Sequence, residues 1–199
     1  AASLSATMAS LKEKPELFAV LANPFSLSNG FSGPEQPTDS KALFDEKLET
    51  WVAPFFMAPI NTKNVHRTNF LNDYAYGDAF QYDEMMMTGP GEKGEAMAKH
   101  VANDKSLASD KGPKPGEGPS KEERENGFYD VLFVGQATNG DTLAVSVKGD
   151  KDPGYGSTCK MISESALCLC QDVTLPGGFY TPAAALGQNL IQRLEEKAG

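Results

Sequence analysis

The segment FYDVLFVGQA (128–137), the turn Thr138-Asn139-Gly140 and the segment DTLAVSVKGD (141–150) decide the fold expected for this chain. Asn-Gly between two strand patterns favours a type I′ turn, which requires positive φ at both central residues. In the second segment three apolar residues (Leu143, Val145 and Val147) alternate with smaller or polar ones, so one face should be buried. These segments predict an antiparallel β-hairpin.

Two more strands are expected upstream of the hairpin. They are NVHRTNFL (64–71) and AFQYDEMMMT (79–88), and we expect the methionines Met85, Met86 and Met87 to fill a core. The segment WVAPFFMAPIN (51–61) is broken by two prolines, which favours buried irregular backbone. The strands together predict an antiparallel β-meander of about four strands.

Helical patterns flank these strands. The spacing of apolar residues predicts helices over 3–22, 40–49, 92–107 and 156–171, and a last helix that begins at Pro182 with Thr181 as its cap. Pro15 should divide the first of them. The expected fold class is α+β, with residues 1–199 as a single domain and a long exposed insertion at about 89–126.

Composition excludes several classes of function. The 199 residues carry a formal net charge of -9, which argues against nucleic acid and, more weakly, against docking on anionic lipid through charge. No apolar run approaches the ~20 residues of a transmembrane helix. We therefore expect an intracellular protein, with peripheral association with membrane or lipid left open.

Metal and cysteine patterns are weak. Cys159, Cys168 and Cys170 have no zinc-type spacing, and we expect three reduced, mostly buried thiols in the reducing compartment of a cytoplasm or organelle, with no metal. His66 is a lone histidine, for which a structural or solvent-facing role is the simpler interpretation. The segment GPGEKGEA (89–96) lacks the strand–loop–helix context of a nucleotide loop.

The segment GDKDPGYGSTCKMISES (149–165) is the richest in chemistry. A strand ends, a turn through Asp152 and Pro153 follows, and Ser157 opens a helix whose N-terminus suits a carboxylate or phosphate. Tyr155 and Lys160 are candidates to donate a proton or hold an anion. The structural alternative is that Asp152 and Ser157 only cap the helix and that the tyrosine packs.

Two other polar segments are candidate sites. One of them is the row Asn61, Arg67 and Asn69, which starts before the expected strand 64–71 and continues along it. Arg67 could bind a carboxylate or phosphate, or it could pair with an acidic residue of a neighbouring strand. The turn GGFYTP (177–182) contains Gly177 and Gly178, which permit close approach of another domain or a cofactor.

The same segments carry a family resemblance. In order, WVAPFFMAPINTKNVHRTNFL, YGDAFQYDE, PGEGPSKEERENGF, GDKDPGYGSTCKMISESALCL and GGFYTPAAALGQNLIQRL resemble the C-terminal half of saccharopine dehydrogenase-like oxidoreductases. That group includes proteins described as trans-acting enoyl reductases. One departure is SATMAS (5–10), which stands where the family usually has a Gly-Gly-Thr signature.

The resemblance implies the C-terminal half of a two-domain dehydrogenase, without the Rossmann domain that carries NAD or NADP. It implies hydride transfer to an enoyl, keto or imine-type substrate. Tyr155 and Lys160 would be catalytic, and Gly177, Gly178 and Thr181 would approach the cofactor. Polar groups of the substrate would be bound by a third set of residues: Asn61, Arg67, Asn69 and Ser157.

The partners implied are an upstream or separate Rossmann domain and further copies in a homo-oligomer or larger assembly. On this interpretation the chain alone is inactive. The alternative is a non-catalytic structural or interaction subunit, derived from the family by loss of the cofactor domain; the missing domain and SATMAS favour it.

Overall fold

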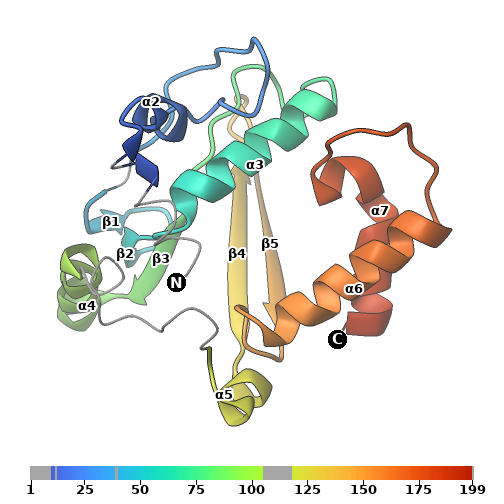
Figure 1. Cartoon of the computed structure of the whole chain (residues 1–199). Helices are drawn as coiled ribbons and strands as arrows, with labels where there is room; N and C mark the ends of the chain where they lie inside the picture. Colours follow the sequence, from blue (N-terminus) through green and yellow to red (C-terminus); the bar gives the residue numbers. More distant parts are fainter. Residues whose placement is uncertain (1–9, 12, 39, 105–117, 199) are drawn as a thin grey trace. The chain divides into compact units, whose positions relative to one another are not determined.

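The computed structural model describes residues 10–11, 13–38, 40–104 and 118–198 (Figure 1). The chain divides into two compact units, unit 1 (Ala1–Glu117) and unit 2 (Gly118–Gly199), and each is described by itself. Both contain helices and antiparallel strands, so the α+β class is confirmed. The expected meander is wrong in detail, because the strands form one three-stranded and one two-stranded sheet.

Unit 1 is built around a small sheet in the order β1 (Leu43–Asp45), β2 (Thr50–Pro54), β3 (Met85–Gly89). Its central strand contributes Val52 and Ala53, which are both buried. The helix expected over 40–49 is wrong. The Asp45 carboxylate instead accepts hydrogen bonds from the backbone of Lys47 and Leu48, and this turn returns the chain into β2.

Helix α3 (Ala58–Leu71) replaces the strand expected at 64–71. Pro54 ends β2 and Pro59 lies in the first turn of α3, where a missing N–H costs little, so both prolines border regular elements. The buried positions of α3 are polar, which hides the helical period from an apolar pattern: Lys63, His66, Thr68 and Asn69. The expected irregular segment 51–61 is therefore wrong as well.

The expected strand 79–88 is regular only from Met85 onward. Before Met85, the Gln36 side chain makes hydrogen bonds to the backbone that a neighbouring strand would otherwise make. Its Oε1 accepts a hydrogen bond from the Tyr82 amide at 2.9 Å, and its Nε2 donates to the Phe80 carbonyl at 3.3 Å. Met86 and Met87 are exposed, so the expectation that they fill a core is also wrong.

Two helices complete unit 1. Helix α4 (Gly91–Asn103) confirms the helix expected from residue 92 and packs on β2 and β3 with Ala98 buried. A Cβ on Gly94 would lie 1.8 Å from the Gly89 carbonyl oxygen, so only glycine fits this crossing. Helix α2 (Leu17–Ala22) follows Pro15, and the remainder of the expected helix 3–22 falls largely outside the described residues.

Unit 2 begins with α5 (Lys121–Asn126), where Ser120 and Glu123 form a reciprocal capping box. The expected exposed insertion at 89–126 is thus ordered at both ends, as α4 and α5, while 105–117 lie outside the described residues. Helices α6 (Gly156–Gln171) and α7 (Pro182–Arg193) confirm the two last expected helices, and a π-helical turn (Leu194–Ala198) follows. Gly187 interrupts α7 with a φ of 48°.

The predicted hairpin is confirmed as β4 (Tyr129–Gln136) and β5 (Thr142–Gly149). The expected type I′ turn is wrong, because Gly140 has a φ of 93° whereas Asn139 does not have a positive φ. Directly opposed residues share a face, so one face is continuously apolar: Tyr129, Val131, Phe133, Leu143, Val145 and Val147. The other face carries the 2.8 Å ion pair between Lys148 and Asp130. The expected burial is wrong, because the residues of the apolar face other than the half-buried Tyr129 are exposed, from 40% at Val131 to 69% at Leu143.

Candidate functional site

The turn that leads into α6 is organised by the carboxylate of Asp152. Its Oδ2 accepts hydrogen bonds from the backbone N–H groups of Tyr155 at 2.7 Å and Gly156 at 3.3 Å. The hydrogen bond from the Tyr155 backbone N–H is the main cause of the lowered pKa of Asp152. The anion expected at this helix N-terminus is thus supplied by the chain itself.

The side chains expected beside this turn have different surroundings. Tyr155 is 53% exposed, so its phenol is accessible to a reactant, contrary to the packed alternative. Ser157 is buried, and its amide donates to the Asp152 carbonyl at 2.8 Å. The Lys160 ammonium donates to Asp150 at 3.0 Å and to the Ala198 carbonyl at 2.7 Å. Lys160 therefore links the end of β5 to the C-terminal turn.

The three polar candidates of unit 1 lie on α3 and not on a strand. Asn61 donates to both carboxylate oxygens of Glu84, at 2.9 and 3.1 Å. Arg67 donates to the Leu27 carbonyl at 3.0 Å and lies over the Phe70 ring. These side chains are engaged within unit 1, whereas Tyr155, Ser157 and Lys160 belong to unit 2.

Asn69 is the most enclosed of these candidates. It is 3% exposed, its Nδ2 donates to the Gly77 carbonyl at 2.8 Å, and its Oδ1 accepts from the Tyr76 amide at 2.8 Å. Both ends of the amide thus hold the turn that follows α3.

His66 is enclosed between the rings of Phe25 and Phe80. Its Nε2 lies 3.0 Å from Gln36 Oε1, which already accepts the Tyr82 amide, so His66 is the donor. Burial lowers the pKa of His66. The structural interpretation of this histidine is confirmed.

A groove of about 710 Å³ lies between α6, the connecting segment 173–181 and α7. It is the feature that sequence reasoning missed. The residues that form most of its apolar lining are Ile162, Ala166, Leu169, Val173, Leu175, Pro176, Pro182, Ala185 and Leu186. All three residues expected near a cofactor, Gly177, Gly178 and Thr181, also line it.

The two glycines differ in their surroundings. A Cβ on Gly178 would lie 2.9 Å from the Tyr180 ring, so this ring would have to shift to admit a side chain. A Cβ on Gly177 would have no neighbour within 4 Å, so the groove is open there. Thr181 is buried at the N-cap position of α7.

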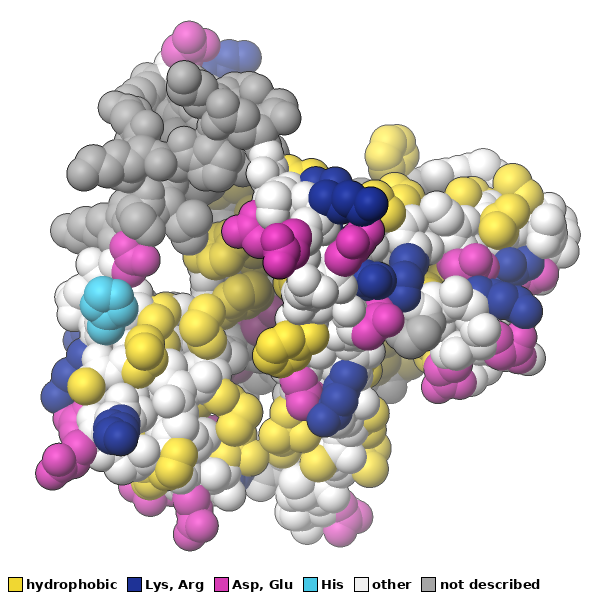
Figure 2. Space-filling model, turned by 90° about the horizontal axis from the view of Figure 1, so that it is seen from below, with side chains coloured by type: hydrophobic (Ala, Val, Ile, Leu, Met, Phe, Trp, Pro, Cys, Tyr) yellow, Lys and Arg dark blue, Asp and Glu magenta, His cyan; other side chains and the backbone are white. Residues whose placement is uncertain are grey.

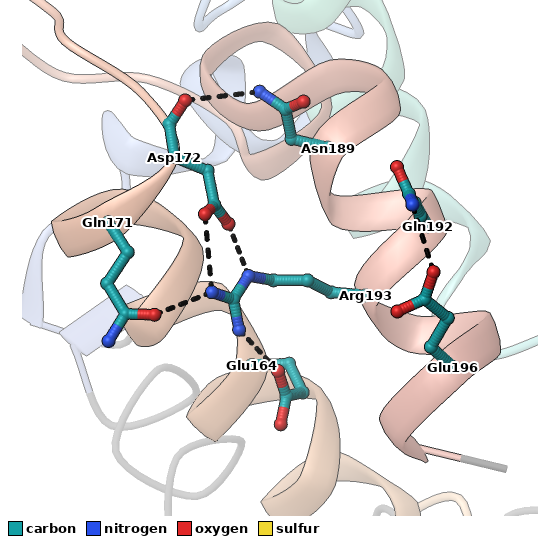
Figure 3. A network of polar contacts seen from close by, with 7 residues as sticks. All are labelled: Glu164, Gln171, Asp172, Asn189, Gln192, Arg193 and Glu196. Carbon is teal, nitrogen blue, oxygen red and sulfur yellow. Dashed lines mark hydrogen bonds and ion pairs between the residues drawn. The ribbon is translucent and has the colours of Figure 1, made fainter.

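Arg193 fixes the two helices that form the groove (Figure 3). Its guanidinium donates to the Asp172 carboxylate, to Glu164 at 3.0 Å and to Gln171 at 2.7 Å. These contacts lower the pKa of Asp172 and raise that of Arg193, in each case first through their shared hydrogen bond. The partners lie 21 to 29 residues away in the chain, so no local motif points to this cluster.

Apolar and thiol groups also reach the surface. Figure 2 shows hydrophobic side chains in several patches among acidic and basic ones. Cys168 is buried, and this burial is the main cause that raises its pKa, but Cys159 and Cys170 are exposed. The expectation of mostly buried thiols is therefore wrong.

Within the described ranges, no helix is long and apolar enough to cross a membrane. The same part of the chain has no group of three or more His, Cys, Asp or Glu side chains placed to hold a metal ion.

The fold and the groove define an α+β chain with an apolar site between α6 and α7. Comparison with known proteins gives the class more sharply, because the chain is similar to proteins named trans-acting enoyl reductase. This similarity supports a relationship to an enoyl reductase-like family. No family model and no solved structure matches the chain.

The particular relatives are mycobacterial. Rv2449c of Mycobacterium tuberculosis strain H37Rv, provisionally named a trans-acting enoyl reductase, is 32% identical over 220 residues, which cover 97% of this chain and 52% of the relative. The trans-acting enoyl reductase of Mycobacterium ulcerans strain Agy99 is 30% identical over 225 residues, covering 98% and 53%. That of Mycobacterium bovis strain BCG is 29% identical, covering 97% and 52%. The chain thus spans about half the length of each relative.

Proposed function

We propose that this chain is the substrate-side part of an enoyl reductase-like oxidoreductase. The observation that carries the proposal is the similarity to proteins of that name over 97% of the chain. The reaction is reduction of a carbon–carbon double bond conjugated to a carbonyl. A bound reduced nicotinamide would supply the hydride for the β carbon, and this chain would supply the proton for the α carbon.

The nicotinamide cofactor, NAD or NADP, belongs in this proposal to a Rossmann domain outside the described residues. Dinucleotides bind where a parallel strand passes through a glycine loop into a helix. Both sheets of the described chain are antiparallel, and β5 reaches α6 through the Asp152 turn. The described residues therefore do not fit the whole cofactor, although Gly177, Gly178 and Thr181 remain candidates to approach it.

Tyr155 is the proposed proton donor, because its phenol is exposed and its backbone is held by Asp152. Lys160 is proposed to be a positioning residue, because its ammonium joins Asp150 to the C-terminal turn. Ser157, Asn61, Arg67 and Asn69 remain proposed substrate contacts, although Asn69 and Ser157 are buried and would have to be uncovered for a substrate to reach them. Their hydrogen bonds within the chain would have to be exchanged or shared on binding.

The experiment uses the native protein in the form its source makes. It is mixed with an enoyl thioester and either NADH or NADPH, and nicotinamide absorbance and the saturated product are followed. We expect turnover, and we expect Tyr155→Phe to lower kcat by about 100-fold, as loss of a general acid does. Tyr76→Phe is the matched control, because Tyr76 is 49% exposed in unit 1. Absence of product from the folded native protein would contradict the proposal.

A second candidate is a non-catalytic structural or interaction subunit. The exposed apolar face of the β4–β5 hairpin favours it, since contiguous apolar surface marks contact sites. In this case the native assembly contains further copies or a partner, and enoyl reduction is absent. The native mass separates the candidates when it is read together with the activity assay.

A further inference from the structure

The groove between α6 and α7 is formed by residues that lie on one helical face and a short return segment. Ile162, Ala166 and Leu169 follow the helical period along α6, and Ala185 and Leu186 face them from α7. Arg193 holds the two helices through Asp172 and Glu164. The groove is therefore a fixed feature of unit 2.

Polar side chains in the groove are already used within the chain. The Ser165 hydroxyl donates to the Met161 carbonyl at 2.7 Å, and the Tyr180 hydroxyl donates to the Pro176 carbonyl at 3.2 Å. A ligand rich in polar groups would have to break these bonds. An apolar ligand gains from the aliphatic walls and breaks none of them.

The size and access of the groove suit a small ligand. Its volume of about 710 Å³ lies inside the ~300–1,000 Å³ range of small-molecule sites. Gly177 has open space where a side chain would be, so a chain can pass over this part of the groove. An extended hydrocarbon chain satisfies the shape and the chemistry together.

We propose that this groove binds the hydrocarbon chain of an acyl substrate. The proposal rests on the proposed function, which supplies an acyl group, and adds where its apolar part lies. It involves no bond making or breaking. It places the acyl chain along α6, whose N-terminus carries Tyr155.

The test is a binding titration of the full chain without any nicotinamide. Decanoyl-N-acetylcysteamine is the probe, and acetyl-N-acetylcysteamine is the short-chain comparison, with heat of binding and the methyl signals of Ile162 as readouts. We expect the decanoyl probe to bind at least about tenfold more tightly than the acetyl probe. Equal affinity, or shifts confined to residues outside the groove, overturns the proposal.

Two matched substitutions locate the site. Ala166 lines the groove and is exposed, so Ala166→Trp fills it without disturbing a core; Ala183 is also exposed but does not line it. We expect Ala166→Trp to weaken decanoyl binding by about tenfold or more and Ala183→Trp to leave it unchanged. Equal effects from the two variants overturn the proposal.

The assay separates this proposal from the proposed function. If the native protein reduces an enoyl substrate but binding in the groove does not depend on chain length, only the assignment of the groove is wrong. Binding in the groove without enoyl reduction by the native protein removes only the oxidoreductase assignment.

Discussion

The two units treat similar apolar strands in opposite ways. In unit 1 the central strand β2 is covered, with Val52 4% exposed and Ala53 fully buried, and helix α4 packs on the sheet. In unit 2 the hairpin presents Phe133 and Val145 with nearly half their surface exposed. Unit 1 thus covers its central strand, whereas unit 2 leaves an apolar face of its hairpin exposed.

The largest effect is expected where a buried polar group holds unit 1. Asn69→Ala removes both bonds to the turn after α3 and leaves a buried carbonyl and amide unpaired, so it should cost about 2–3 kcal/mol. Fluorescence of Trp51 in β2 reports unfolding of unit 1 in urea. Asn64→Ala on the exposed side of α3 is the control, with a cost within about 0.5 kcal/mol. Equal costs would contradict a structural role for Asn69.

A matched pair of valines tests the contrast in burial. Val52→Ala should destabilise unit 1 by about 2 kcal/mol, because the side chain is buried. Val145→Ala should change the stability of unit 2 by no more than about 0.5 kcal/mol, because that side chain is 49% exposed. Hydrogen exchange of the β4–β5 amides measures the second effect. A large loss at Val145 would show that the hairpin face is covered in solution.

The pH dependence of unit 1 should follow His66. Its pKa is lowered from 6.5 by burial, so the unfolded chain binds a proton more readily than the folded chain. Its contribution is fully present above about pH 6.5 and is lost as the pH falls toward the folded pKa. We expect the urea midpoint of unfolding, followed by Trp51 fluorescence, to fall as the pH is lowered from about 7.5 to about 5. His66→Gln should make that fall smaller. An unchanged slope in the variant would be evidence against this assignment.

The smallest effect is expected at the clamp between α6 and α7. Arg193→Gln removes the charge shared with Asp172 and Glu164, and it should lower the thermal midpoint of unit 2 by a few degrees. Amides of α7 should exchange faster, while Trp51 fluorescence in unit 1 stays unchanged. Lys151→Gln removes a charge outside this cluster and serves as control. A matched loss in both variants would indicate a general charge effect.

Local signals predicted the parts of the fold that local chemistry determines. Asn139-Gly140 predicted the hairpin, and Thr181-Pro182 predicted the start of α7. Helix α3 was not predictable from apolar spacing, because its buried positions are polar and His66 is satisfied by Gln36, which lies 30 residues earlier. The buried side of α3 is satisfied by hydrogen bonds to residues far away in the chain, which apolar spacing does not reveal.

The candidate site divides in the same way. The Asp152 turn follows from Asp-Pro-Gly beside a strand end, and the sequence predicted it, but the sequence left open whether Tyr155 is packed or exposed. The groove requires Arg193 to meet Asp172, 21 residues away, and the apolar residues of α6 look like an ordinary core stripe. Burial of the hairpin face was predicted from alternation alone, although alternation identifies the apolar face and not what covers it.

The oxidoreductase assignment is tested most directly by transfer of a labelled hydride by the native protein. Nicotinamide cofactor carrying deuterium at the transferred position is incubated with an enoyl thioester, and the product is analysed by mass spectrometry and NMR. We expect a saturated acyl product with a single deuterium on the β carbon, and much less of it with Tyr155→Phe. Unlabelled or unreduced substrate, recovered from protein shown to be folded, would contradict the oxidoreductase assignment.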